Sequence, residues 1–167
     1  MRATKIFTVL VIGFFATSCV TEIGPAGEDG VVEIYTSTIV INSNIDFGVV
    51  DEFVSIASYE WNNLDEATVD YGVVLGYLRF EGSTNWHALP FSTPFENDVV
   101  VLRYSFDINN FDLIIEGEVA DNNEVNEAIF DGDELRVVAI PSSLLLKGKG
   151  IDYSDYEQVA RLYNLER

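Results

Sequence analysis

Hydrophobic and polar residues alternate with a period of two along much of the chain, which is the pattern of β-strands that bury one face. The clearest case is Val99–Ile108, where every second residue from Val100 onward is apolar. Asn109 and Asn110 separate it from a second alternating run, Phe111–Val119, and predict a hairpin with a two-residue turn, because Asn tolerates positive φ. The expected strands are Val31–Ile41, Phe53–Trp61, Tyr71–Phe80, Trp86–Phe91, Val99–Ile108, Phe111–Val119 and Leu135–Ile140.

Seven short strands separated by frequent turns predict a mainly β domain, an antiparallel β-sandwich of the immunoglobulin-like, Greek-key type. A partly open barrel is the alternative architecture. The run Tyr71–Phe80 is apolar on both faces, so we expect it to be buried on both sides of its sheet. The run Trp86–Phe91 lies beside Pro90 and Pro94, which is typical of an edge strand.

The end of the chain changes to a helical period. Apolar residues recur at helical spacing over Tyr156–Tyr163. Ser154, followed three residues later by Glu157, has the sequence of a capping box. We therefore predict one C-terminal α-helix over about 152–165, packed on the sheet or across an open end of it.

The first residues have the pattern of an export signal. Arg2 and Lys5 precede the uncharged apolar run Ile6–Ala16, which has the length of a signal-peptide core and is too short to span a bilayer. Small residues and then Cys19 follow, and this segment resembles a bacterial lipobox, in which the cysteine is diacylated on sulfur. We predict a lipoprotein signal peptide over residues 1–18 and a lipid on Cys19; the alternative is plain secretion with a free thiol.

Cys19 is the single cysteine of the chain, so no internal disulfide can form, and lipidation accounts for the odd thiol. Residues 19–30 contain two collagen-type triplets, Gly24–Ala26 and Gly27–Asp29, which are too few for a triple helix. We expect this segment to be an extended tether between the lipid and a single domain over residues 31–167.

Charge narrows the classes of partner. The chain has 9 Lys and Arg against 28 Asp and Glu, a net charge of −19, and removal of residues 1–18 with their two positive charges leaves −21. Such a chain lacks the basic patch that nucleic-acid binding requires, and it is not attracted to anionic lipid headgroups. Hydrophobic residues make up 48% of the sequence, which is enough for a folded core.

Few residues suggest site chemistry. The acidic segment Asp121–Glu134 is best interpreted as a solvated loop, because Val125 stands where an EF-hand needs Asp or Asn; weak calcium binding near Asp131 and Asp133 is the alternative. His87 is the single histidine and has no cysteine to help it bind zinc, so we interpret it as an ordinary surface residue.

Two further groups of residues have the composition of a functional site. Asp65, Glu66 and Asp70 could form a carboxylate pair of the glycosidase kind, although a charged turn is the simpler interpretation. Trp61 and Trp86, with Tyr77 and Phe91, could provide a platform for sugar stacking, although such residues more often pack inside a core. Trp61 and Trp86 are candidate binding residues, and no catalytic residue or cofactor is expected.

The segments that bear a family resemblance are Ser18–Cys19, Gly24–Gly27, Val73–Leu78, Trp86–Phe91, Arg136–Pro141, Asp152–Glu157 and Leu162–Leu165.

In these segments the chain resembles a group of outer-membrane lipoproteins of Bacteroidota-type bacteria. The resemblance implies a lipoprotein of the outer membrane and no established activity. Val20–Glu22 poorly match the acidic or lysine-containing segment that often follows the lipidated cysteine of surface-exported members, so the periplasmic and the surface face both stay open.

The expected function is a non-catalytic binding or scaffolding module of the cell envelope. Its expected partners are the membrane, through the lipid on Cys19, and an envelope protein or a glycan, with no nucleic acid. The alternatives are a small envelope hydrolase acting on glycan or peptide polymers and a weak calcium-binding surface module.

Overall fold

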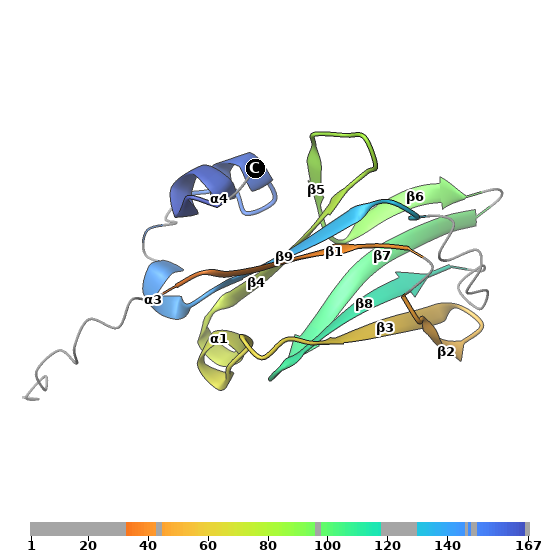
Figure 1. Ribbon diagram of the computed structural model, residues 1–167, viewed down its shortest axis with the longest axis horizontal. Coiled ribbons are helices and arrows are strands. Elements are labelled where there is room, and N and C mark those ends of the chain that lie inside the picture. The colour runs from red at the N-terminus through yellow and green to blue at the C-terminus, as the bar shows by residue number, and fades with distance from the viewer. Residues whose placement is uncertain are drawn as a thin grey trace, which may run out of the picture. The chain divides into compact units, whose positions relative to one another are not determined.

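Two antiparallel sheets face each other in the computed structural model and form a sandwich (Figure 1). The first sheet has the strand order β1-β9-β4-β5 and the second has the order β2-β3-β8-β7-β6. The sandwich prediction is therefore confirmed, and among the described strands none joins the two sheets into a barrel. The elements are β1 (Tyr35–Val40), β2 (Gly48–Asp51), β3 (Val54–Glu60), α1 (Glu66–Tyr71), β4 (Val73–Arg79), β5 (Trp86–Ala88), β6 (Phe91–Phe95), β7 (Asp98–Asp107), β8 (Asn110–Glu116), β9 (Glu134–Ile140), α3 (Ser142–Leu145) and α4 (Tyr156–Tyr163).

The structure describes residues 33–42, 45–95, 98–117, 130–145, 147 and 150–165. The predicted signal peptide, Cys19 and the tether of residues 19–30 lie outside these residues, as does most of the predicted acidic loop. Within the described part, none of the helices has the length and apolar character needed to cross a bilayer.

Two hydrophobic clusters stabilise the fold. The first fills the space between the sheets, where Leu78 of β4 and Leu135 of β9 meet Leu113 of β8. The second lies between the first sheet and α4, where Tyr156 and Val159 pack with residues of β4 and β9. The strands β4 and β9 are thus covered on both faces, as the apolar run of β4 predicted.

The hairpin turn is shifted by one residue from the prediction. Asp107 pairs with Asn110, so the two turn residues are Ile108 and Asn109, and Asn110 already belongs to β8. Asn109 has a positive φ of 59°, which is the property for which Asn was expected there. Phe106 pairs with Phe111 in the same register.

The capping-box prediction is wrong in its residues. The N-cap of α4 is Asp155, whose side chain accepts from the amide of Gln158 at 3.1 Å. Ser154 belongs to the turn before the helix, because its hydroxyl donates to Asp152 Oδ1 at 2.7 Å. Because Asp152 closes this turn, the helix starts one residue later than predicted.

The predicted charged turn before β4 is a short helix. Asp65 is its N-cap and accepts from the amide of Thr68 at 2.7 Å. Tyr71 ends this helix and is 70% exposed, so it is not the first residue of a buried strand. The strand begins at Val73, after Gly72 has donated its amide to the Thr68 carbonyl.

The predicted strand Trp86–Phe91 is two strands in two different sheets. β5 pairs with β4 in the first sheet, and β6 pairs with β7 in the second. Leu89 and Pro90 carry the chain between the sheets, and both strands lie at sheet edges, as the proline pattern predicted. Alternation does not predict β2, because all four of its residues are exposed.

Gly76 of β4 permits a close approach between the sheets. A Cβ atom there would lie 2.9 Å from Cδ1 of Tyr104 and 3.1 Å from a methyl of Leu89. Tyr104 is also held in place by its hydroxyl, which donates to the Val74 carbonyl at 2.8 Å. The ring therefore has little freedom to move away.

We predict that Gly76→Ala lowers the free energy of unfolding by about 1–3 kcal/mol, because the core has no room for the added methyl. The matched control is Gly48→Ala, whose Cβ would meet its nearest neighbour at an ordinary 3.6 Å. Urea unfolding followed by circular dichroism compares the two. Equal stability of both variants would contradict the packing argument.

Candidate functional site

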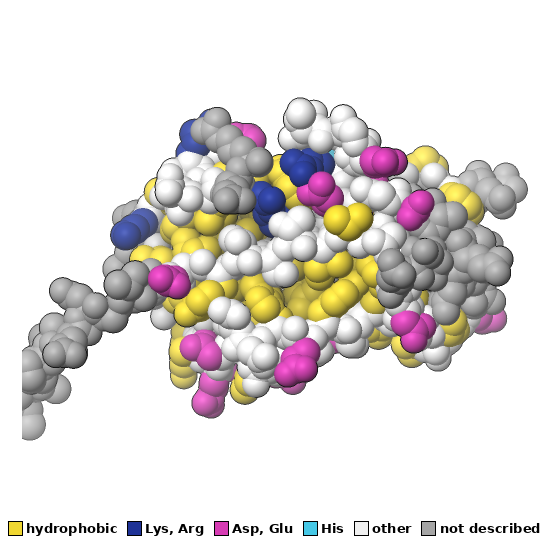
Figure 2. All heavy atoms as spheres, viewed as in Figure 1, with side chains coloured by type: hydrophobic (Ala, Val, Ile, Leu, Met, Phe, Trp, Pro, Cys, Tyr) yellow, Lys and Arg dark blue, Asp and Glu magenta, His cyan; other side chains and the backbone are white. Residues whose placement is uncertain are grey.

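An apolar groove runs between the two sheets on the side where β1 and β3 face each other. Figure 2 shows hydrophobic side chains exposed along this furrow. We call it the β1–β3 groove, and its cavity volume is about 110 Å³. It is lined by Ser37, Ile39 and Val137 of the first sheet and by Tyr59, Glu60, Trp61 and Phe111 of the second sheet and the end of β3.

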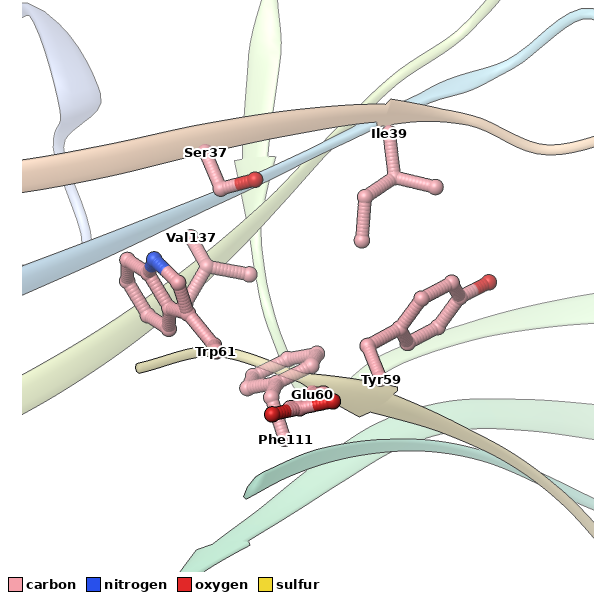
Figure 3. A pocket seen from close by; sticks show the side chains of 7 residues that line it. All are labelled: Ser37, Ile39, Tyr59, Glu60, Trp61, Phe111 and Val137. Atoms are coloured by element: carbon pink, nitrogen blue, oxygen red, sulfur yellow. The ribbon is translucent and has the colours of Figure 1, made fainter. Parts of the chain in front are cut away.

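Strand alternation brings these side chains together. In β1, Ser37 and Ile39 face inward, while the residues that alternate with them, Thr36, Thr38 and Val40, are exposed. Tyr59 and Trp61 are two residues apart and share the inner face of the second sheet. The Trp61 amide donates to the Asn109 carbonyl at 2.9 Å, which extends the pairing of β3 beyond its last strand residue. In Figure 3, Trp61 and Tyr59 lie on either side of Phe111, and Ser37 and Ile39 of β1 lie above them.

The size of the groove limits what it can hold. Pockets for drug-sized ligands have volumes of about 300–1,000 Å³. The β1–β3 groove, at about 110 Å³, is well below that range and suits one apolar side chain. Glu60 is the one charged residue among those that line it.

Tyr59 contributes an unusual polar group. Its hydroxyl oxygen is buried and has no hydrogen-bond partner among the described residues. Burial raises the pKa of Tyr59 to about 12, so the phenol is neutral at physiological pH. An unpaired buried hydroxyl costs free energy of about 1–3 kcal/mol.

Trp86 lies elsewhere. It belongs to β5 and packs with the second cluster, its ring centroid 5.2 Å from that of Tyr156. The guanidinium carbons of Arg79 and Arg136 each lie 4.5 Å from the Trp86 centroid, a cation–π arrangement that covers the ring. The structure therefore does not bring Trp86 to the groove in which Trp61 lies.

The other candidate aromatic residues also have packing roles. Tyr77 is fully buried beneath α4, and its hydroxyl donates to the Tyr153 carbonyl at 2.6 Å. Phe91 packs against the cluster between the sheets. His87 packs in tilted orientations against Phe80 and Phe91, at centroid distances of 5.2 and 5.5 Å. None of these three residues lines the β1–β3 groove.

Asp131 and Asp133, the candidate calcium ligands, lie in the turn before β9. Asp133 is 6% exposed, and its Oδ1 accepts from the amide of Glu81 at 2.8 Å. Burial raises the pKa of Asp133, and the nearby carboxylates of Glu81 and Asp131 raise it further, while the Glu81 amide lowers it. In the part of the chain that the structure describes, no group of three acidic, histidine or cysteine side chains could hold a metal ion.

Comparison with known proteins gives no match, either to a protein-family model or to a curated protein. The groove and the sequence pattern at the N-terminus are therefore the features that bear on function.

We predict that Asp133→Asn changes stability in a pH-dependent way. The amide can still accept from the Glu81 backbone but carries no charge near Glu81 and Asp131. Because the folded pKa is raised, the Asp133 carboxyl favours folding below its unfolded pKa of about 3.9, and this contribution is lost as pH rises through the folded value. The variant should thus gain stability relative to the wild type between pH 4 and 7.

Urea unfolding of both proteins at several pH values measures the difference. A difference that stays constant from pH 4 to 7 would show that Asp133 is not desolvated as described.

Proposed function

We propose that the protein is a lipid-anchored, non-catalytic binding module of the cell envelope that holds a segment of another envelope protein in the β1–β3 groove. The observation that carries this proposal is the groove itself: an apolar slot of about 110 Å³ between two sheets, with Trp61 and Ile39 on its walls. Its volume favours a single side chain of a protein partner over a free small molecule.

The charges of the groove support a binding role over hydrolysis. Acid–base cleavage of a glycan needs two carboxyl groups held at a defined separation. Glu60 is the one carboxylate that lines the groove, and Asp65 is occupied as the N-cap of α1.

The aromatic residues support a protein partner over a glycan. Sugar stacking needs an open ring face, whereas two guanidinium groups lie over the ring of Trp86. Trp61 lies in a slot too small for a sugar ring together with its substituents.

The anchor is supported by the sequence pattern. The basic start, the apolar run and the small residues before Cys19 together suit lipidation and export. Two acyl chains give stable residence in a bilayer, whereas one gives marginal binding. With a net charge of −21 after cleavage, the domain is repelled by anionic headgroups, so the lipid is the expected contact with the membrane.

We predict that Cys19→Ser releases the protein from membranes, because the lipid has no other attachment point. Fractionation of cells that produce each form at equal levels, read with an antibody, tests this. A serine variant that still sediments with membranes after a high-salt wash would overturn the anchor.

The groove is tested by site-specific crosslinking in cells. Photoreactive p-benzoylphenylalanine replaces Glu60 at the mouth of the groove, or Val99 on β7, which is two strands away from β3 and exposed. We expect the Glu60 position, and not the Val99 position, to crosslink to one defined segment of an envelope protein, identified by mass spectrometry.

A second variant separates groove binding from chance proximity. Ser37→Leu should fill the slot with an apolar side chain and abolish the crosslink from Glu60, while Thr36→Leu, on the exposed face of β1, should leave it unchanged. A crosslink that survives Ser37→Leu would place the partner outside the groove and contradict the proposal.

A further inference from the structure

The free edge of β1 differs from the other sheet edges. β5 has three residues, β2 has four and a register shift between Val49 and Asp51, and β6 contains Pro94. These are the devices by which proteins discourage the pairing of an edge strand with another chain. β1 has six consecutive strand residues, Tyr-Thr-Ser-Thr-Ile-Val, with no charge, glycine, proline or register shift. Among the described edges, β1 is therefore the one without protection.

The backbone of β1 presents a regular row of hydrogen-bonding groups at this edge. The Ile41 amide donates to the Asp133 carbonyl at 2.8 Å, and the register of β1 with β9 continues from this pair without a shift. In an antiparallel ladder, alternate residues direct their N–H and C=O groups to opposite neighbours. Thr36, Thr38 and Val40 therefore direct theirs away from β9, toward the free edge.

The same edge borders the β1–β3 groove. Ser37 and Ile39 line the groove from β1, while Ser58 and Glu60 lie beyond the part of β3 that pairs with β2. A strand added to β1 would place alternate side chains on the inner face, where one of them meets the slot beside Trp61. Backbone pairing and side-chain insertion are thus compatible with one extended segment.

Charge indicates which segment fits. Glu60 lies at the groove and Glu33 is exposed just before β1, while the whole chain has a net charge of −19. A second copy of this chain would bring the same negative charge to the edge and be repelled. An extended segment with an apolar side chain between Lys or Arg residues is complementary.

We propose that the partner binds by strand addition: an extended, basic-flanked segment of another protein pairs with the free edge of β1 and inserts one apolar side chain into the β1–β3 groove. This inference rests on the proposed function, since it concerns the same site. It adds that the backbone of β1, and not the groove alone, recognises the partner.

The test uses the full mature chain with Cys19→Ser and a synthetic peptide, acetyl-Lys-Thr-Val-Thr-Leu-Thr-Val-Lys-amide. Amide hydrogen exchange measured by NMR should slow by about tenfold or more at Thr36, Thr38 and Val40 when the peptide is added. Exchange at the exposed residue Val99 should not change. A version of the peptide with N-methyl groups on alternate amides should lose affinity about tenfold or more, because it cannot complete the ladder.

Two protein variants test the edge directly. Thr36→Pro removes one outward N–H without touching the ladder to β9, and proline is tolerated on a strand edge when its nitrogen faces solvent. Thr36→Val keeps the amide and is the matched control. We expect weaker peptide binding for the proline variant and unchanged binding for the valine variant. If Thr36→Pro does not fold, the affinity of the wild-type protein for the N-methylated peptide provides the test instead.

The outcomes separate this inference from the proposed function. If Ser37→Leu abolishes binding but N-methylation and Thr36→Pro do not weaken it, groove binding stands and strand addition is wrong. If amide protection appears without peptide and rises with protein concentration, the occupant is a second copy, and the basic partner is wrong. Absence of protection at millimolar peptide also overturns strand addition, whatever the crosslinking from Glu60 gives.

Discussion

The burial of β4 and β9 on both faces is the constraint on which the rest of the structure depends. Leu78 and Leu135 face the second sheet, while Tyr77 and Val138 face α4. A strand with two apolar faces is stable only when both are covered. The second sheet covers one face and the C-terminal helix covers the other, so the three layers follow from the composition of two central strands.

This constraint also explains where the groove lies. β9 is central because β1 pairs with it on one side and β4 on the other. β1, with exposed Thr36 and Thr38 on its outer face, does not need a further layer there. It therefore ends the sheet, and its inner residues Ser37 and Ile39 meet the second sheet at the rim of the sandwich, where that sheet leaves a slot.

The sequence predicts the local elements better than their partners. Alternation identifies most strands, because a strand with one buried face repeats every two residues, and it fails for β2, whose residues are all exposed. It joins β5 to β6, because the change of sheet at Leu89 and Pro90 leaves the pattern intact. Trp61 could be named as a candidate from its residue type. Ser37 and Ile39 could not, because only long-range pairing makes β1 an edge.

The net charge and the open edge are physically linked. A long, regular, uncharged edge strand is an aggregation hazard for a protein at high local concentration, such as one confined to a membrane surface. Repulsion between copies that each have a net charge of −19 opposes such pairing without altering the edge itself. The acidic residues outside β1 thus permit the strand itself to stay uncharged and free to pair with a basic segment, and their charge opposes pairing with a second copy of the domain.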